Sequence, residues 1–114
     1  MKIFKKIDDV FVGSIMGLKG EYEDAIFRID PDEIITIGRD PKTSQIVVSE
    51  ENSLVSRTHC TIKGDALTGL YSVTDYSRNG TYVNGAKLPS GVTVSVPRGS
   101  VICIGNSDNA FRLN

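Results

Sequence analysis

Residues 70–88, with the sequence LYSVTDYSRNGTYVNGAKL, carry much of the information about the fold of this protein. Residues 70–75 and 81–83 are short runs rich in tyrosine, valine and threonine, a composition typical of β-strands. Asn84-Gly85 follows the second run, and this pair is a strong signal for a type I′ turn in a β-hairpin. The segment therefore predicts two strands separated by a polar loop, and then a hairpin that returns into residues 86–88.

The same alternation of short apolar runs and turn residues continues along the rest of the chain. Further strands are expected at residues 10–12, 14–16, 26–29, 34–37, 45–48, 58–63, 92–96, 101–104 and 110–113. In residues 58–63, Cys60 and Ile62 share one face, and His59, Thr61 and Lys63 share the other. About ten short strands at a spacing of roughly 8–12 residues indicate an all-β sandwich or barrel.

Length and composition limit the classes of protein to which the chain can belong. Its 114 residues suit one domain, which we place at residues 10–114 after a short lead-in at residues 1–9. A net charge of −1 argues against binding nucleic acid or a membrane surface through bulk charge. No signal peptide or membrane-spanning run is apparent, so we expect a cytoplasmic protein.

Metal and redox chemistry are not indicated by the sequence. The two cysteines, Cys60 and Cys103, form no C-x-x-C pair, and His59 is the single histidine. We therefore expect two buried free thiols, no metal site and no cofactor.

Charged, hydroxyl and amide side chains that could bind a ligand concentrate in three loops, at residues 38–43, 53–59 and 76–81. Loops of a sandwich gather at its two ends, so several can face one surface. Together these loops would present the cationic groups of Arg39, Lys42, Arg57 and Arg78, the hydroxyls of Ser56 and Ser77, and the amide of Asn79. A phosphate dianion is bound by such a set, in which guanidinium forks are combined with neutral donors.

The residues of these loops resemble the signature of forkhead-associated (FHA) domains. The resemblance is carried by Gly38-Arg39, Ser56-Arg57-Thr58-His59 and residues 75–85, with Gly99 and Ile104-Gly105 fitting the C-terminal pattern. It extends from about Gly13 to Leu113 and implies an FHA/SMAD-like β-sandwich of about eleven mostly antiparallel strands, with the binding loops at one end. The implied function is a phosphothreonine-dependent adaptor in serine/threonine kinase signalling, a monomer that can form part of a larger chain.

The resemblance also implies roles for individual residues. Five residues are expected to bind the phosphopeptide: Arg39, Ser56, Arg57, Arg78 and Asn79. Four are expected to support the binding loops: Gly38, His59, Gly80 and Asn84. Within the first set, Arg39 and Ser56 would contact the phosphate, and Asn79 would hold the peptide main chain. Arg78 departs from the family, because many members have Thr or another small residue there, and the apolar Leu54 disfavours a preference for acidic flanking residues.

Two other classes of function are considered beside the adaptor. Ser56, His59 and Asp75 could suggest a hydrolytic triad, but the sequence has no Gly-x-Ser-x-Gly elbow and no glycine run for an oxyanion hole. We therefore expect no enzyme activity. The alternative is a phosphate-independent interaction or dimerisation scaffold on the same fold, although such domains usually lack the arginine or the serine that this sequence retains.

Overall fold

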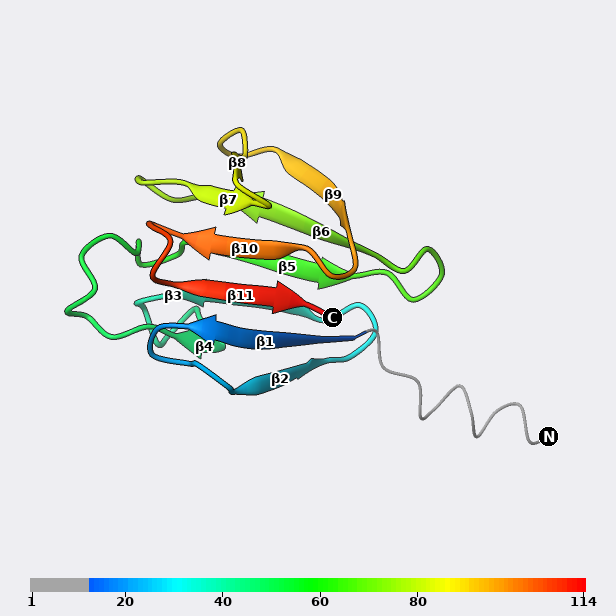
Figure 1. Ribbon diagram of the computed structural model, residues 1–114, viewed down its shortest axis with the longest axis horizontal. Coiled ribbons are helices and arrows are strands. Elements are labelled where there is room, and N and C mark those ends of the chain that lie inside the picture. The colour runs from blue at the N-terminus through cyan, green and yellow to red at the C-terminus, as the bar shows by residue number, and fades with distance from the viewer. Residues whose placement is uncertain (1–12) are drawn as a thin grey trace.

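Eleven β-strands form the described part of the protein, residues 13–114 of a computed structural model (Figure 1). The strands are β1 (Gly13–Lys19), β2 (Ile26–Ile29), β3 (Ile34–Gly38), β4 (Ile46–Val47), β5 (Cys60–Gly64), β6 (Leu70–Asp75), β7 (Thr81–Val83), β8 (Ala86–Lys87), β9 (Thr93–Pro97), β10 (Val101–Ile104) and β11 (Ala110–Leu113). The lead-in expected at residues 1–9 and the strand expected at 10–12 lie outside the described residues. Within residues 13–114 there is no helix long and apolar enough to cross a membrane.

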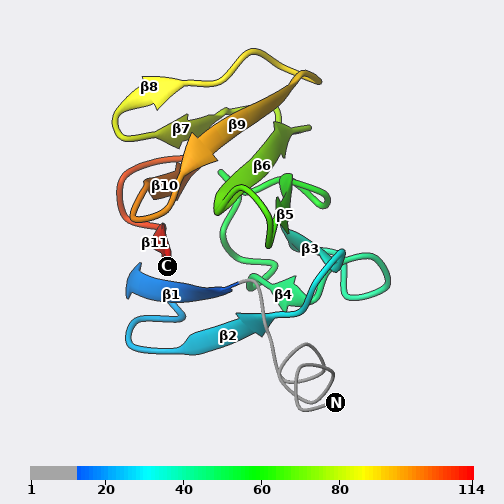
Figure 2. The same cartoon turned by 90° about the vertical axis from the view of Figure 1, so that its right-hand side faces the viewer.

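The strands form two sheets that pack face to face, as the view in Figure 2 shows. One sheet has the order β2-β1-β11-β10-β7-β8, and the other has the order β4-β3-β5-β6-β9. All named pairs are antiparallel except β3 with β4. The predicted all-β sandwich is therefore confirmed.

The core lies between the sheets and follows from the alternation of side chains along each strand. The first sheet contributes Ile15, Ile102, Ile104, Phe111 and Leu113, and the second contributes Ile35, Ile37, Ile62, Tyr71 and Val73. Each of these side chains is at most 4% exposed, and burying one typically contributes about 1.5–3 kcal/mol. The core holds the strand ends, and with them the loops, in fixed positions.

The predicted hairpin joins β7 to β8. Asn84 and Gly85 have φ values of 49° and 86°, as a type I′ turn requires, and Val83 pairs with Ala86 on either side of them. The Asn84 side-chain oxygen accepts the Val101 N–H at 2.9 Å, and the Asn84 N–H donates to the Val101 carbonyl at 2.8 Å. Asn84 therefore fastens the hairpin to the start of β10.

His59 precedes β5 and is fully buried, as expected for a structural histidine. The expectation of two buried thiols is wrong for one of them. Cys103 is only half-buried, because Ile102 and Ile104 occupy the inward positions of β10 and leave the thiol on the outer face. Cys60, in contrast, is buried as expected.

The different environments of the two thiols give a direct test of the fold. Burial, with a contribution from the Asp75 carboxylate, raises the pKa of the Cys60 thiol to about 12. In a titration with a chromogenic disulfide reagent at about pH 8, we expect Cys103 alone to react in the folded protein, because the thiolate is the nucleophile. Cys60 should react only after denaturation, and similar reaction rates for both thiols in the native state would contradict this arrangement.

Candidate functional site

The β3–β4, β4–β5 and β6–β7 loops meet at one end of the sandwich, on the left in Figure 1. The Arg39 N–H donates to the Ser56 carbonyl, and the Asp40 N–H donates to the Arg57 carbonyl, both at 3.1 Å. The Arg78 N–H donates to the Ser56 hydroxyl oxygen at 3.0 Å. Ser56 therefore connects all three loops at this end of the sandwich.

Gly38 allows the β3–β4 loop to approach the β4–β5 loop closely. A Cβ atom at this position would lie 2.0 Å from the Arg57 carbonyl oxygen and 3.0 Å from the Ser44 hydroxyl. The first of these contacts is with backbone, which cannot rotate away. Any side chain at Gly38 would push the Ser56-Arg57 segment out of its place.

The Arg39 side chain is hydrogen-bonded to the neighbouring β4–β5 loop. Its Nε donates to the Val55 carbonyl, and the side chain is half-buried. The described residues provide no other hydrogen-bond or ion-pair partner for this guanidinium. Its two terminal nitrogens thus remain available for two oxygens of an anion.

His59 joins two of the loops from inside the fold. Its Nδ1 accepts the Ser56 N–H at 3.0 Å, and its Nε2 lies 2.9 Å from the Gly80 carbonyl. The imidazole can make both bonds only when it is neutral with the proton on Nε2. Burial lowers the pKa of His59 below its ordinary value of 6.5 and so favours this neutral form, although the bond to Gly80 and the charge of Asp75 oppose the shift.

Asp75 and Ser77 shape the β6–β7 loop. Asp75 is 2% exposed, and its Oδ1 accepts the Ser77 N–H at 3.1 Å, the Ser77 hydroxyl and the Thr81 hydroxyl at 2.8 Å. The Ser77 hydroxyl oxygen in turn accepts the Gly80 N–H at 2.7 Å. Ser77 therefore faces inward, and the expectation that its hydroxyl would contribute to the anion-binding surface is wrong.

These contacts form a closed ring of hydrogen bonds. Ser77 binds Gly80, Gly80 binds His59, His59 binds Ser56, and Ser56 binds Arg78, the neighbour of Ser77. Ser56 and His59 are linked through the main-chain N–H of Ser56 and not through its hydroxyl. The serine, histidine and aspartate consequently lack the geometry of a hydrolytic triad.

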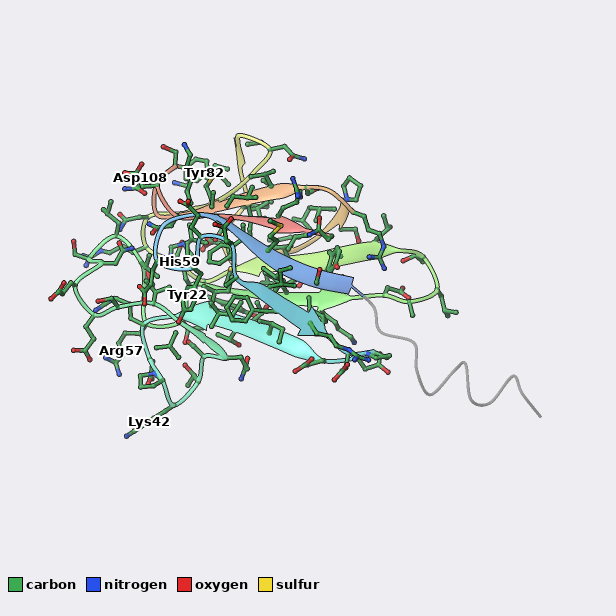
Figure 3. The ribbon with its side chains drawn as sticks, turned by 60° about the horizontal axis from the view of Figure 1, so that its bottom comes forward. Tyr22, Lys42, Arg57, His59, Tyr82 and Asp108 are labelled. Atoms are coloured by element: carbon green, nitrogen blue, oxygen red, sulfur yellow. The ribbon has the colours of Figure 1, made fainter. Side chains whose placement is uncertain are left out.

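The charged side chains lie on the outside of this ring. The Arg57 Nη2 lies 3.4 Å from the Asp40 Oδ2, and the Arg57 side chain is 66% exposed. Neither Lys42 nor Arg78 has an ion-pair partner among the described residues. Figure 3 shows Lys42 and Arg57 projecting outward at the loop end, with His59 inside.

The two asparagines of the motif occupy different places. The Asn79 side-chain amide donates to the Leu54 carbonyl at 3.1 Å, which connects the β6–β7 and β4–β5 loops. Asn84 contacts Val101 and Ser100 and is not brought to the loop cluster. Of the nine residues named for binding or for support of the loops, Asn84 alone lies away from the cluster. Asp75, named in the sequence motif and in the possible triad but given no supporting role, enters the cluster as a support.

The neutral imidazole makes stability depend on pH. Because the pKa of His59 is lower in the folded protein, the unfolded chain takes up the proton first as the pH falls below about 6.5. Below about pH 6.5, down to the lowered pKa of the folded protein, we expect the free energy of unfolding to fall with pH by at most about 1.4 kcal/mol per pH unit. Denaturant titrations measure this loss, and NMR follows the single imidazole; an imidazole that titrates at or above pH 6.5 in the folded protein would contradict the bonding described here.

Comparison with known families and sequences gives two matches. The sequence model of the FHA domain matches residues 35–105. A probable serine/threonine-protein kinase of Dictyostelium discoideum, fhkA, is 37% identical over 109 residues, which cover 89% of this chain and 18% of the kinase. The chain thus spans less than a fifth of the length of that protein.

Solved structures with the same fold include several FHA domains. The FHA domain of an Arabidopsis thaliana hypothetical protein has a TM-score of 0.76 and 26% identity, covering 91% of this chain and 87% of that chain. The FHA domain of CT664 from Chlamydia trachomatis has a TM-score of 0.75 and 25% identity, covering 88% and 93%. The N-terminal FHA domain of S. cerevisiae RAD53P, in complex with a phosphothreonine peptide, shares the fold with a TM-score of 0.65 and 21% identity, covering 88% of each chain. Since the sequence match extends over more than half of the residues and the fold agrees, the chain belongs to the FHA domain family.

Proposed function

We propose that this domain is a cytoplasmic adaptor that binds phosphothreonine segments of partner proteins in serine/threonine kinase signalling. The proposal rests on one observation. The hydrogen bond from the Arg39 N–H to the Ser56 carbonyl places the two candidate phosphate donors next to each other. Two comparisons support it: the RAD53P domain of the same fold is in complex with a phosphothreonine peptide, and the similar Dictyostelium protein is a probable serine/threonine kinase.

The hydrogen bonds of the site leave the right donors for a phosphate. Arg39 uses Nε on the Val55 carbonyl and keeps its terminal nitrogens for the ligand. The Ser56 hydroxyl oxygen accepts the Arg78 N–H, so its own proton can be donated to a phosphate oxygen. A phosphothreonine carries nearly two negative charges and three acceptor oxygens at neutral pH, which these donors match.

The remaining candidates have secondary roles in this proposal. Arg78 and Arg57 add positive charge around the phosphate. Both side chains are exposed. The Arg78 N–H is bonded to the Ser56 hydroxyl, and Arg57 lies beside Asp40. Asn79 holds the main chain of the bound segment, while Gly38, His59 and Gly80 keep the loops in place. Asn84 supports the domain indirectly, through β10.

The domain is proposed to extend over residues 10–114, as a monomer that can belong to a larger chain. In support, β1 and β11 lie outside the matched residues 35–105 and complete the six-stranded sheet through their pairing. No catalytic role is proposed.

Binding to a peptide library with a central phosphothreonine tests the proposal. We expect micromolar affinity for the phosphothreonine set, weaker binding of phosphoserine and no binding of the unphosphorylated set, measured by fluorescence anisotropy. Affinity should also fall below about pH 6, where the phosphate takes up its second proton. Equal binding of phosphorylated and unphosphorylated peptides would favour a phosphate-independent scaffold instead.

Substitutions at the two phosphate donors should separate binding from folding. Hydrogen bonds to charged groups contribute about 1.5–3 kcal/mol, so Arg39→Ala and Ser56→Ala should each weaken phosphopeptide binding by roughly tenfold to a hundredfold. Arg39→Ala also loses the bond to Val55, at a cost of about 1 kcal/mol in stability.

Arg28→Ala is the matched control, because Arg28 pairs with Asp30 on β2, away from the loop cluster. The control should bind like the unchanged protein. Full affinity of the Arg39→Ala protein, with thermal unfolding showing an intact fold, would contradict the assignment.

A further inference from the structure

None of the residues proposed to bind the phosphopeptide lies on the strands of the six-stranded sheet. In Figure 1, β10 and β11 lie in front of strands of the other sheet, so the outer face of the six-stranded sheet is turned toward the viewer. The loop cluster lies at one end of the sandwich, whereas this face forms one of its sides. The two surfaces are therefore distinct.

The strand register shows which side chains share the outer face. Met16 on β1 pairs with Ile26 on β2 and with Arg112 on β11, and Arg112 pairs with Val101 on β10. Directly paired residues of an antiparallel sheet lie on the same side, and the adjacent positions within β1, β10 and β11 are buried. These four side chains thus form a row across four strands on the outer side, which we call the Met16–Arg112 row.

The Met16–Arg112 row is separated from the loop cluster along the strands. Gly105, which follows β10, packs against Leu54 of the β4–β5 loop. Val101 lies four residues before Gly105, which corresponds to about 13 Å of strand. A ligand on the row therefore need not contact the loops.

The row is apolar for a sheet face that contacts water. Ile26 is 67% exposed, and Met16 and Val101 are half-buried. The outer face of the five-stranded sheet instead carries a paired row of four threonines, Thr36, Thr61, Thr74 and Thr93. One outer face of the sandwich thus suits water, and the other presents apolar surface of the kind that marks interaction sites.

The charged residues on the strands of the six-stranded sheet are all cationic. These strands contain no aspartate or glutamate, and their cations are Lys19, Arg28, Lys87 and Arg112. Arg28 pairs with Asp30 after β2, whereas the other three have no ion-pair partner among residues 13–114. The sheet therefore carries positive charge that carboxylates of the domain itself do not neutralise.

The Arg112 guanidinium combines both properties of the face. Its Nε donates to the Asn114 side-chain oxygen at 3.0 Å, and its Nη2 lies 3.6 Å from the Met16 sulfur. Both neighbours are neutral, and the Arg112 side chain is half-buried. Because solvent screens a half-buried charge less than an exposed one, a carboxylate placed here would be attracted more strongly than at a surface lysine.

Charge distinguishes among the possible occupants of the face. A second copy of the same face would bring like charges together, since symmetric pairing places equivalent patches against each other. Residues 1–12 of this chain contain three lysines and two aspartates, so they also have a positive net charge. A partner segment that combines apolar side chains with carboxylates complements the face in both respects.

We propose that the outer face of the six-stranded sheet, centred on the Met16–Arg112 row, binds an acidic amphipathic segment of a partner protein without need of phosphate. This second docking surface does not depend on the proposed function at the loop end. A domain with both surfaces can hold a phosphorylated segment and an acidic segment at the same time, and so bring two partners together.

Two designed peptides test the proposal. Four strands span about 14 Å, which a helix covers with about ten residues, so fluorescein-labelled helical peptides of about 14 residues are long enough. Both carry leucines along one side, and the remaining positions are glutamate in one peptide and lysine in the other. By fluorescence anisotropy we expect saturable binding of the glutamate peptide and at least tenfold weaker binding of the lysine peptide.

NMR locates the bound peptide on the protein. The amide signals of Met16, Val101 and Arg112 should shift most when the glutamate peptide is added. Shifts confined to the loops at residues 38–43, 53–59 and 76–81 would show that the peptide binds the arginines of the loop cluster instead, and would overturn the proposal.

Charge-reversal variants have a matched control in the other sheet. Arg112→Glu should weaken binding of the glutamate peptide at least tenfold, because attraction is replaced by repulsion. Lys19→Glu, at an exposed position, should weaken it several-fold without altering a half-buried side chain. Lys63→Glu makes the same charge change at an exposed position of β5 and should bind like the unchanged protein.

The remaining outcomes separate this surface from a lipid site and from the proposed function. Equal affinity for both peptides, or an equal loss in the Lys63→Glu control, would overturn the proposal. Binding to phosphatidylserine vesicles without binding to the glutamate peptide would overturn it in favour of a lipid surface. Absence of phosphothreonine binding would overturn the proposed function alone, since the glutamate peptide carries no phosphate.

Discussion

The neutral imidazole of His59 is the interaction on which the arrangement of the site depends. It binds the main chain of Ser56 on one side and of Gly80 on the other, so the two loops that carry the candidate ligand groups cannot move independently. Because these bonds already exist in the free protein, little side-chain and loop ordering remains to oppose ligand binding. A domain with a net charge of −1 can therefore concentrate fixed donors for an anion at one place.

Neutral and charged groups have separate tasks in this arrangement. The ring from Ser77 through Gly80, His59 and Ser56 uses backbone groups, hydroxyls and an uncharged imidazole, and it lies largely inside the fold. The guanidinium groups of Arg57 and Arg78 remain in solvent, where keeping them charged has little desolvation cost. The positive charge of Arg57 and Arg78 is therefore kept without burial, whereas Arg39 is half-buried with its Nε on the Val55 carbonyl.

The strands could be predicted from sequence because their signals are local. Alternating apolar residues and the Asn84-Gly85 turn act over a few positions, and β2, β6, β7, β10 and β11 have the expected bounds. The hydrogen-bond ring could not be predicted from periodicity, since it joins residues such as Ser56 and Gly80 that only the sandwich brings together. For the same reason Ser77 was assigned to the surface. Asn84, which the resemblance led us to expect both as a support of the loops and in the hairpin, shapes the hairpin and lies away from the loops.

At two places around the candidate site, backbone segments approach each other so closely that no side chain fits between them. Gly38 lies against the Arg57 carbonyl and Gly105 against the Leu54 carbonyl, so two walls of the site are main chain. Backbone atoms are the same in every member that keeps these glycines and can position a ligand without distinguishing its sequence. Under the proposed function, discrimination would come from the exposed side chains beside those walls, here Leu54 and Arg78. These side chains lie outside the buried ring, so substitutions there should leave the hydrogen bonds of His59 intact.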